Sequence, residues 1–599
     1  MKFSVLFLAL CTLSLANALF DDVEVFDYVI IGGGAAGSLM ASRLSEDPTK
    51  TVLVLHRGTD EVCFECDNTT SAGSIQNTGL SGVNGADYFS TPQLFTMRNI
   101  REVRTNLPGG ATRFYGSVSI PSSKNLIDKT WPAGLKYNTM LPYLNKMQDH
   151  FCHYLPSSQT NITTAECATY HGTPGPIGMS ISPPTPGPDY DIAKEILLAT
   201  PKYNISVVPD PYNPVHQAKG SYVFPTHAFH NREVPTNVSS RRYRESAWSG
   251  YLPLSLRQQR RNLVYRTEAE GREFVYAKDL TLFPGILARL GLNLFSGLFN
   301  DNSTPRVVGV KYDKDGQIKT VFAKKQVIVS AGVEGTPHLL QANGIGPADL
   351  LSKLGIPLVA NNPAVGQNLA AHAATSMVFL ANQAIPVQAN NQGFPLKMML
   401  SSPLNEGFPD IEIEVALGVG ITEFDVAFSG VPSVYLTTPG VDGSYPFASV
   451  IVAVVNPQWR GSINITSKRF HANSQVEYGW PKDAGGYYAS LDYQKLTHGF
   501  QQMRNIFLGD NNFAKKYIQS EIIPGGPAND FIHSAQYQIF HLTGGMNIGT
   551  ATDMNGAVKG VTGLTVCDNG LLPHPPNGNP TTTMLALCEY VADKLKQRA

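Results

Sequence analysis

The chain has 599 residues, of which 42% are hydrophobic and 16% are charged, with 54 glycines and 41 prolines. This length exceeds what one simple core supports, so we expect two closely packed domains in a loop-rich, enzyme-sized protein. The formal net charge of −1 provides no overall field for nucleic acid or anionic lipid, which argues against both as main partners.

The first eighteen residues have the pattern of a secretory signal peptide. Lys2 supplies the basic start, Phe3 to Leu15 the apolar segment, and Ala16-Asn17-Ala18 the cleavage site. No later segment has the ~18 uninterrupted apolar residues of a membrane span. We therefore expect an exported chain without stable membrane insertion. Asn-x-Ser/Thr sequons fit that compartment as candidate glycan sites, at Asn68, Asn161, Asn204, Asn237, Asn302 and Asn464.

The cysteines that follow the signal segment are even in number, and an oxidising compartment permits disulfides. Cys152 and Cys167 close a short polar loop and are the first predicted pair. Cys63-x-x-Cys66 is interpreted as a structural bridge, whereas Cys567 and Cys588 lie in apolar segments and are interpreted as buried thiols. No Cys/His spacing resembles a zinc site, so no metal is predicted.

A glycine motif opens the part of the chain that is expected to fold. Phe26 to Ile31 predicts a strand and Ser38 to Ser45 a helix, and Gly32, Gly34 and Gly37 between them complete G-x-G-x-x-G. In this context the glycines permit a tight turn, close approach of the backbone to a pyrophosphate, and helix–strand packing. The free N–H groups at the helix start favour phosphate. The motif therefore predicts a dinucleotide site.

His56 stands at an unusual place after the second predicted strand, Thr51 to Leu55. Dinucleotide folds carry an acid there for the adenosine ribose. The imidazole could bond one ribose hydroxyl, Asp60 or Glu61 could reach the ribose instead, or nucleotide affinity could be weaker. The residues leave these three readings open.

Further motifs follow in a fixed order: Leu107 to Thr112 with the pair Gly109-Gly110, His171 to Pro176, Val327 to Gly332, Val365 to Leu369, Trp459 to Ile463, His541 to Gly545, Gly563 to Asp568, and Gly578 to Pro580. With this order and spacing the chain resembles the glucose–methanol–choline (GMC) oxidoreductase family from near its N-terminus to its end. The resemblance implies bound FAD and a small-molecule substrate of the alcohol type.

The resemblance also implies an α/β fold with two domains. A discontinuous Rossmann-type FAD-binding domain would comprise residues 26–184, 241–372 and 531–599. A substrate domain built on an antiparallel sheet would comprise residues 185–240 and 373–530, with strands at Pro409 to Glu414 and Ala448 to Val455. Thr267 to Phe299 is interpreted as a loop-like excursion.

The chemistry is concentrated in the last sixty residues. By resemblance, His541 takes the substrate hydroxyl proton while hydride passes to the flavin N5, and Asn579 is its partner across the substrate oxygen. The backbone at Gly109-Gly110 would pass beside the flavin, and Asp568 would bond its ribityl or pyrophosphate region. Asn579 and Pro580 suit the N-cap and first position of a helix over Thr581 to Lys596, whose positive end would stabilise reduced flavin.

Four other histidines receive no catalytic assignment from the sequence. His372, His498 and His533 lack the motif context of His541 and are interpreted as structural, and His574 is left open.

The sequence also departs from the family pattern. Phe114 occupies the position where some members attach flavin through histidine, which excludes that covalent route, and Tyr115, Gly545 and Thr565 replace the usual Asn, Thr and Arg. His541 with Gly544-Gly545, and Arg57-Gly58-Thr59, are reminiscent of the hydroxynitrile lyase branch. Three functions therefore stay open: an alcohol oxidase or dehydrogenase, a redox-neutral lyase on the FAD scaffold, and a weakly flavin-binding non-catalytic protein. The oligomeric state is not indicated.

Overall fold

The computed structural model describes residues 24–59, 85–89, 100–113, 115–181, 188–229, 244–280, 284–291, 304–385, 395–417, 445–469, 473–481 and 483–598. Several sequence predictions lie outside these residues: the signal segment, Cys63-x-x-Cys66, Asp60 and Glu61, Phe114, and the sequons at Asn68, Asn237 and Asn302.

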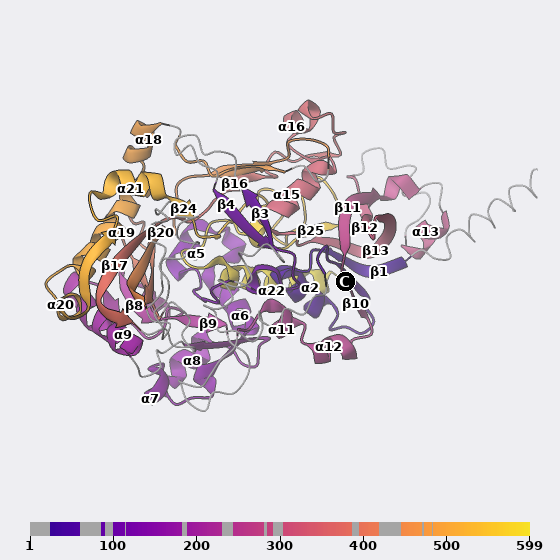
Figure 1. Cartoon of the computed structure of the whole chain (residues 1–599). Helices are drawn as coiled ribbons and strands as arrows, with labels where there is room; N and C mark the ends of the chain where they lie inside the picture. Colours follow the sequence, from indigo (N-terminus) through magenta and orange to yellow (C-terminus); the bar gives the residue numbers. More distant parts are fainter. Residues whose placement is uncertain are drawn as a thin grey trace, which may run out of the picture.

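The described strands form two main sheets at opposite ends of an elongated molecule (Figure 1). The first, the nucleotide sheet, has the strand order β10-β2-β1-β13-β12-β11, and β25 also pairs with β13. Pairing is parallel from β10 to β13 and between β13 and β25, and it is antiparallel where β12 and β11 extend the sheet. Its strands are β1 (Glu24–Ile31), β2 (Val52–Leu55), β10 (Leu263–Arg266), β11 (Ala269–Tyr276), β12 (Val307–Lys314), β13 (Gln317–Val329) and β25 (Leu564–Val566).

The apolar runs in β1 and β2 are explained by burial on both faces of the nucleotide sheet. Ile30 and Val54 face a core that contains helix α2 (Ala35–Leu44), whereas Ile31 and Leu55 face a second core on the other side. The predicted strand, glycine turn and helix at the start of the domain are therefore confirmed.

The second sheet, called here the roof sheet, has the order β23-β17-β20-β19-β18-β8-β7, with β24 paired to β17. Its neighbours are antiparallel except for β7 and β8. Its strands are β7 (Ser206–Val207), β8 (Tyr222–Pro225), β17 (Ala373–Ile385), β18 (Leu396–Leu400), β19 (Ile411–Leu417), β20 (Tyr445–Val454), β23 (Ile518–Ile523) and β24 (Tyr537–Gln538). β24 lies in the segment 531–599, which the sequence assigned to the FAD-binding domain, yet it pairs with β17 of the roof sheet. The domain boundaries stay a prediction.

The two faces of the roof sheet differ in chemistry. Ile411, Ile413 and Val415 of β19 join a large apolar core that includes helix α19 (Leu491–Phe507). Because side chains alternate along a strand, Glu412 and Glu414 lie on the opposite face. Glu412, on that face, lies close to His372 and His541, which are described below.

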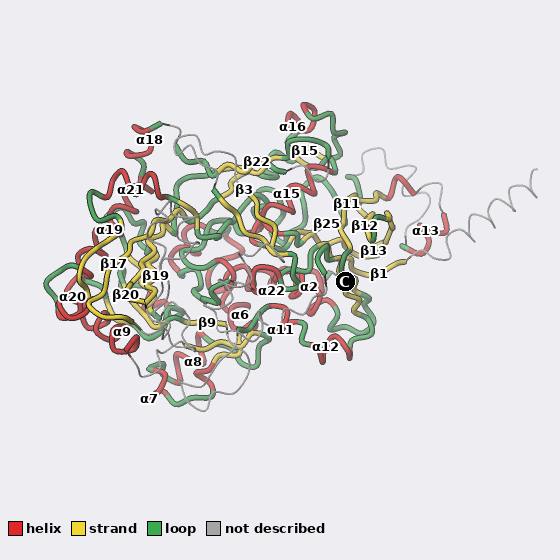
Figure 2. The backbone as a smooth tube through the Cα atoms, viewed as in Figure 1, coloured by secondary structure: helices red, strands yellow, loops and turns green. Residues whose placement is uncertain are grey.

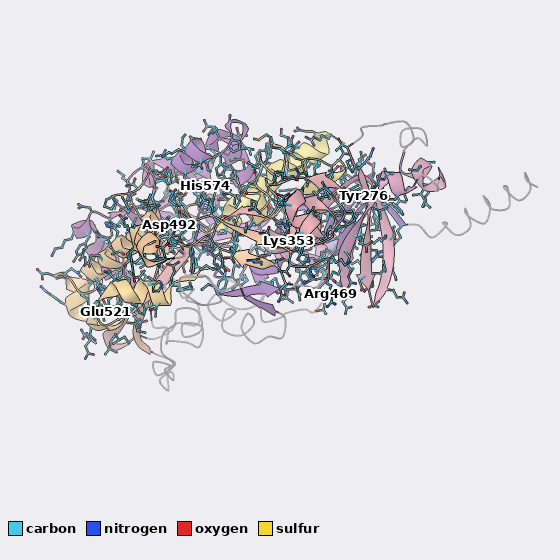
Figure 3. All side chains as sticks on the ribbon, turned by 90° about the horizontal axis from the view of Figure 1, so that it is seen from above. Tyr276, Lys353, Arg469, Asp492, Glu521 and His574 are labelled. Carbon is cyan, nitrogen blue, oxygen red and sulfur yellow. A yellow bond between two sulfur atoms is a disulfide. The ribbon has the colours of Figure 1, made fainter. Side chains whose placement is uncertain are left out.

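Helix α22 (Pro580–Gln597) lies in the middle of the molecule and packs against α2 and α6 (Tyr137–Met147) (Figures 1 and 2). Its Glu589 is fully buried and accepts hydrogen bonds from Arg43 at 2.7 Å and from the Tyr251 hydroxyl at 2.9 Å. Figure 3 shows His574, shortly before α22, between Tyr276 at the nucleotide-sheet end and Glu521 at the roof-sheet end. The chain around α22 therefore joins the two ends.

The remaining described strands and α-helices are β3 (Gly85–Phe89), β4 (Arg101–Thr105), α5 (Lys124–Thr130), β5 (Gln148–His150), α7 (Ser157–Thr160), α8 (Thr164–Tyr170), β6 (Ile177–Ile181), α9 (Pro188–Ala199), α10 (Pro214–Gln217), β9 (His227–Phe229), α11 (Ala247–Tyr251), α12 (Leu254–Gln259), α13 (Pro284–Arg289), α15 (Gly332–Ala342), β14 (Ile345–Gly346), α16 (Ala348–Lys353), β15 (Ala360–Asn361), β16 (Gln367–Leu369), β21 (Gly461–Asn464), β22 (Gln475–Glu477), α18 (Ala484–Ala489), α20 (Asn512–Tyr517) and α21 (Ala528–Ala535). Within the described ranges, no helix combines the length and the apolar character that crossing a bilayer requires.

Two sequence interpretations are corrected by the fold. Residues Ala269–Tyr276, interpreted as part of a loop, form β11, because their partner β12 supplies a long antiparallel ladder. Cys567 and Cys588, interpreted as thiols, form a disulfide with a Cα–Cα distance of 5.9 Å, since α22 packs beside the end of β25. The predicted disulfide between Cys152 and Cys167 is present, with a Cα–Cα distance of 6.0 Å.

Candidate functional site

The two glycine motifs meet at the carboxyl end of the nucleotide sheet. The Gly109 N–H donates to the Gly33 carbonyl at 2.8 Å. A Cβ on Gly110, whose φ is +58°, would lie 3.0 Å from the Gly34 Cα, whereas a Cβ on Gly34 would meet only the Gly110 Cα, at 3.9 Å. Bare backbone from both motifs therefore borders a space that suits the close approach of a pyrophosphate.

Buried polar atoms around this cradle also fit a dinucleotide. The Oγ atoms of Ser38 and Ser330 and the Oδ1 of Asn569 are buried and have no hydrogen-bond partner within the described part of the chain. Ser330 and Asn569 follow the carboxyl ends of parallel strands β13 and β25, which is where open α/β sheets bind ligands. These atoms require polar partners, so the residues present fit FAD.

Both ring nitrogens of His56 form hydrogen bonds with backbone groups of the protein. Its Nδ1 accepts from the Gly33 N–H at 3.3 Å, so the neutral ring carries its proton on Nε2 and donates it to the Asn106 carbonyl at 2.6 Å. His56 thereby connects the first glycine loop to the segment that leads into Gly109-Gly110. A contact between His56 and an adenosine ribose stays a prediction.

Asp568 is likewise held by donors of the protein. Its Oδ2 accepts from the Thr336 hydroxyl at 2.6 Å and the Gly332 N–H at 3.0 Å, and its Oδ1 accepts from the Gly570 N–H at 2.8 Å. Burial raises the pKa of Asp568, and these hydrogen bonds act in the opposite direction. Asp568 thus joins the end of β25 to the start of α15.

His541 and Asn579, which the sequence paired, are in contact. The Asn579 Nδ2 lies 3.1 Å from the His541 Nε2. Because an amide nitrogen only donates, His541 Nε2 accepts and the ring proton sits on Nδ1. That Nδ1–H donates to the Nδ1 of His372 at 3.0 Å. Burial, His372 and Lys397 lower the pKa of His541 well below its usual value. The His541 imidazole is therefore neutral, and its proton-accepting nitrogen is directed at Asn579.

His372 is a neighbour that the sequence interpretation did not assign to the site. It precedes β17, and its contact with His541 spans 169 residues. Burial lowers its pKa to about 3, although the Pro576 carbonyl acts in the opposite direction. The signal in the sequence was its place three residues after Leu369, beside the motif Val365 to Leu369 that the resemblance had already identified.

The start of α22 leaves its N–H groups available. Asn579 occupies the N-cap, but its side chain makes no capping bond because it is directed at His541. The Thr582 hydroxyl in the first turn bonds the Ser119 Oγ at 2.7 Å, and the Thr583 hydroxyl accepts from the Ser122 N–H at 3.0 Å. Side chains thus hold the helix end in place, and its partial positive charge can face an anionic group.

Two of the departures from the family pattern, Gly545 and Thr565, have local structural reasons. Gly545 has a φ of +88°, which a threonine would not adopt without strain. Thr565 accepts from the Gln326 amide at 2.8 Å, and Arg57 donates to the Asn106 side chain at 2.8 Å. Arg57 thus supports the segment ahead of the second glycine motif. The Tyr115 hydroxyl is buried, with no hydrogen-bond partner among the described residues.

The other histidines lie in different surroundings. His574 accepts from Arg460 at 3.3 Å and donates to the Pro575 carbonyl at 2.8 Å, and burial with Arg460 lowers its pKa to about 4. His498 is on α19, which packs on the far face of the roof sheet, and His533 packs against Tyr487.

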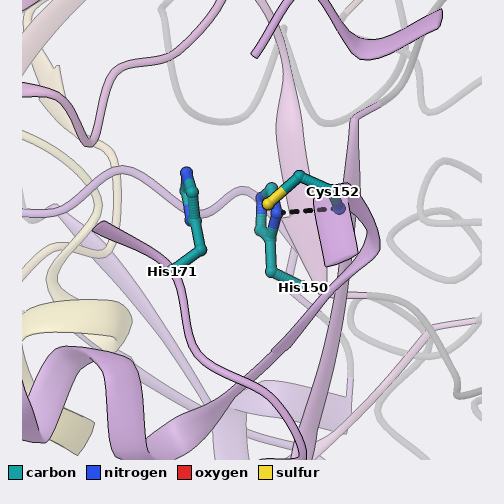
Figure 4. A group of neighbouring side chains, drawn as sticks. All are labelled: His150, Cys152 and His171. Atoms are coloured by element: carbon teal, nitrogen blue, oxygen red, sulfur yellow. Dashed lines mark hydrogen bonds between the residues drawn. The ribbon is translucent and has the colours of Figure 1, made fainter. Parts of the chain in front are cut away.

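A second histidine cluster lies beside the Cys152–Cys167 disulfide (Figure 4). The rings of His150 and His171 stack with centroids 3.7 Å apart, and the Cys152 N–H donates to the His150 Nδ1. Their spacing with Cys152 would suit a metal, but the Cys152 sulfur is committed to the disulfide and His171 bonds Asp210 at 3.1 Å. The side chains of this cluster are therefore bonded to other protein groups and pack beside the disulfide.

Comparison with known proteins covers nearly the whole chain. Family models described as GMC oxidoreductase match residues 26–374 and 457–588. A choline oxidase from Arthrobacter globiformis is 23% identical over 595 residues, which are 95% of this chain and 94% of that protein. An oxygen-dependent choline dehydrogenase from Chromohalobacter salexigens is 25% identical, over 96% of this chain and 95% of that protein.

Solved structures show the same fold. A pyridoxine 4-oxidase from Mesorbium loti aligns with a TM-score of 0.75 and 20% identity, over 96% of this chain and 99% of that one. A formate oxidase from Aspergillus oryzae, studied for FAD modification, aligns with a TM-score of 0.75 and 18% identity, over 96% and 98% of the two chains.

Proposed function

Because this chain belongs to the GMC oxidoreductase family and is an FAD-dependent oxidoreductase, we propose that it oxidises an alcohol, with His541 as the general base. The observation that carries the proposal is the contact of 3.1 Å between His541 and Asn579 at the positive end of α22. The substrate alcohol is not specified by the names of the relatives, which range from choline to formate oxidase.

In this proposal the alcohol replaces the direct hydrogen bond between Asn579 and His541, and its oxygen lies between the two side chains. Its O–H donates to His541 Nε2, and the oxygen accepts from Asn579 Nδ2, so the hydroxyl is oriented and its proton has an acceptor. FAD, which the glycine cradle at Gly34 and Gly110 and the start of α22 would hold, would supply the acceptor for the hydride. The lowered pKa of His541 keeps the imidazole neutral at neutral pH, as a base must be before the reaction.

Replacing His541 with Ala tests the proposal, because it removes the proton acceptor and leaves the cradle untouched. Flavin content should stay near wild type, while flavin reduction by an alcohol should slow by roughly 10²–10⁴, the range for losing a general base. Anaerobic stopped-flow absorbance with an alcohol panel measures the rate. His498→Ala, on the far side of the roof sheet, is the control and should reduce normally.

Other outcomes would point elsewhere. Equal reduction rates in wild type and His541→Ala would remove His541 as the base. Turnover of a cyanohydrin without flavin bleaching would favour the lyase reading, and a wild type that no alcohol reduces would favour a binding role.

We also propose that the chain is exported. The N-terminal signal pattern and the two disulfides in the described residues support this, since disulfides persist in oxidising compartments.

A further inference from the structure

Glu412 is a buried acid beside the candidate catalytic histidines. Its side chain is fully buried, and neither carboxylate oxygen has a hydrogen-bond partner in the described part of the chain. Burying a carboxylate without donors is unfavourable. One oxygen of Glu412 and one ring nitrogen each of His372 and His541 all lie within 4.8 Å of one another. The Glu412 carboxylate is therefore close enough to His372 and His541 to interact electrostatically with a positive charge on either ring.

The register of the roof sheet explains how Glu412 is held there. Glu414 lies directly opposite Lys397 across β18 and β19, and Glu412 is diagonal to Lys397 on the same face. Lys397 forms an ion pair with Glu414, and its Nζ lies 3.6 Å from the Glu412 Oε1. Burial raises the pKa of Glu412, and the Lys397 cation acts in the opposite direction.

The groups that influence the pKa of His541 all disfavour its protonated form. Burial, His372 and Lys397 all oppose a positive charge on His541. Further from His541, Arg460 bonds His574, and both Arg460 and Lys495 lower the pKa of His574. β20 contributes Ser449, Ile451 and Ala453 to this face, none of them charged.

We propose that Glu412 is the counter-ion of protonated His541. This inference rests on the proposed function. The alcohol O–H bond breaks and its proton moves to His541 Nε2, the oxygen electron pair closes the carbonyl, and the hydride from the C–H bond would be accepted by the FAD that the proposed function requires. His541, still donating through Nδ1 to His372, has then gained one positive charge. The Glu412 carboxylate balances that charge without touching the substrate, so Glu412 is a positioning residue, and His372 fixes the tautomer.

Glu412→Gln tests the counter-ion, because it keeps the shape and removes the charge. Without the carboxylate the pKa of His541 should fall further. The plateau rate of flavin reduction should drop by roughly 10–100-fold, which is less than for loss of the base itself. In the pH profile of that rate, the acid limb, where His541 becomes protonated, should move to lower pH by about one unit or more. Nitrogen-15 NMR of the His541 ring in the oxidised protein should show the same shift without turnover.

Glu414→Gln is the matched control, since it removes the same charge from the same strand face two residues away. Because Glu414 is the ion-pair partner of Lys397, which itself lowers the pKa of His541, Glu414→Gln should lower the His541 pKa and move the acid limb less than Glu412→Gln does. If Glu412→Gln does not fold, the double variant Glu412→Gln/Lys397→Met, which leaves no new lone cation, is compared with Lys397→Met in the same way.

Each remaining outcome overturns the proposal. If the plateau rate of flavin reduction and its acid limb are unchanged in Glu412→Gln, Glu412 carries no charge that stabilises protonated His541. A weaker substrate Kd with an unchanged limb would make Glu412 a substrate contact. A stoichiometric metal in the wild type that Glu412→Gln loses would make the three side chains a metal site. Reduction that is equally fast in His541→Ala would instead refute the proposed function on which this inference rests.

Discussion

At position 56 the imidazole does what a carboxylate could not do in the same surroundings. His56 accepts from the Gly33 N–H through one nitrogen and donates to the Asn106 carbonyl through the other. A carboxylate has no proton to donate, so its oxygen would face the Asn106 carbonyl oxygen. The histidine that replaces the usual acid therefore serves to link the two glycine loops, which a carboxylate at position 56 would not do in the same way.

The first prediction follows from this pair of bonds. His56→Gln can accept through its amide oxygen and donate through its nitrogen, so FAD binding should be close to wild type. His56→Glu should weaken FAD by roughly tenfold to a hundredfold, because one buried hydrogen bond is replaced by repulsion of about 1–3 kcal/mol. Flavin retention during dialysis and titration with FAD measure both. Tighter binding by His56→Glu would show instead that the ribose lacks a partner in the wild type.

At the scale of elements, α22 is the helix on which the candidate site depends. Its first residue follows Asn579, its middle is bound by Glu589 to α2 and α11, and Cys588 ties it to Cys567 at the end of β25. Asp568, next to that disulfide, is bonded to the start of α15. The position of Asn579 relative to the nucleotide sheet is thus set by covalent and buried polar links.

Breaking the Cys567–Cys588 link should therefore affect both stability and the site. The disulfide spans 21 residues, and for such a loop its removal should lower the free energy of unfolding by about 3 kcal/mol. Urea unfolding of Cys567→Ala/Cys588→Ala measures this loss, and FAD retention should fall as well. The matched control, Cys152→Ala/Cys167→Ala, opens a loop of similar size and should lose comparable stability while keeping FAD. Equal FAD loss in both variants would remove the special role of α22.

At the scale of the whole molecule, buried neutral histidines should make the fold sensitive to acid. Burial lowers the pKa of His227 and of His574 to about 4 and that of His372 to about 3. In the unfolded chain these groups titrate near their ordinary value of about 6.5. Between these pH values the unfolded state binds more protons, so stability rises with pH and is lost on acidification.

We expect the urea midpoint to fall as the pH drops from about 6.5 to 4. Each buried histidine contributes a slope of up to about 1.4 kcal/mol per pH unit. Tryptophan fluorescence at several pH values gives the curve. His227→Gln removes one of these groups and should flatten it relative to wild type. A midpoint independent of pH in this window would show that these histidines are protonated in the folded protein.

The glycan prediction also concerns the whole molecule, because it depends on which sequons reach the surface. Asn161 and Asn204 are exposed, whereas Asn464 is half-buried and bonds Gln367 and Ser462. After expression in a eukaryotic secretory host, glycans should occupy Asn161 and Asn204 and not Asn464. Site-resolved mass spectrometry measures the occupancy, with Asn161→Gln and Asn204→Gln as references. An exported but unmodified chain would contradict this.

Much of the nucleotide domain was predictable from the sequence because its signals are local. The apolar run before Gly32 and the glycine spacing predict β1 and α2, and Asn579-Pro580 predicts the start of α22. The alternation around Glu412 also predicts a strand with two unlike faces. The family resemblance, carried by motif order, added the cofactor and the pairing of His541 with Asn579.

Only the tertiary structure decided the contacts that join distant segments. His372 meets His541 across 169 residues, and Cys567 lies within disulfide distance of Cys588 because α22 packs beside β25. The direction of the Asn579 side chain, toward His541 and not its own helix, likewise depends on where the roof sheet holds the histidines. Local sequence sets backbone preference and the faces of an element, whereas the neighbour of a buried polar group is chosen by packing, which brings together residues whose spacing along the chain carries no signal.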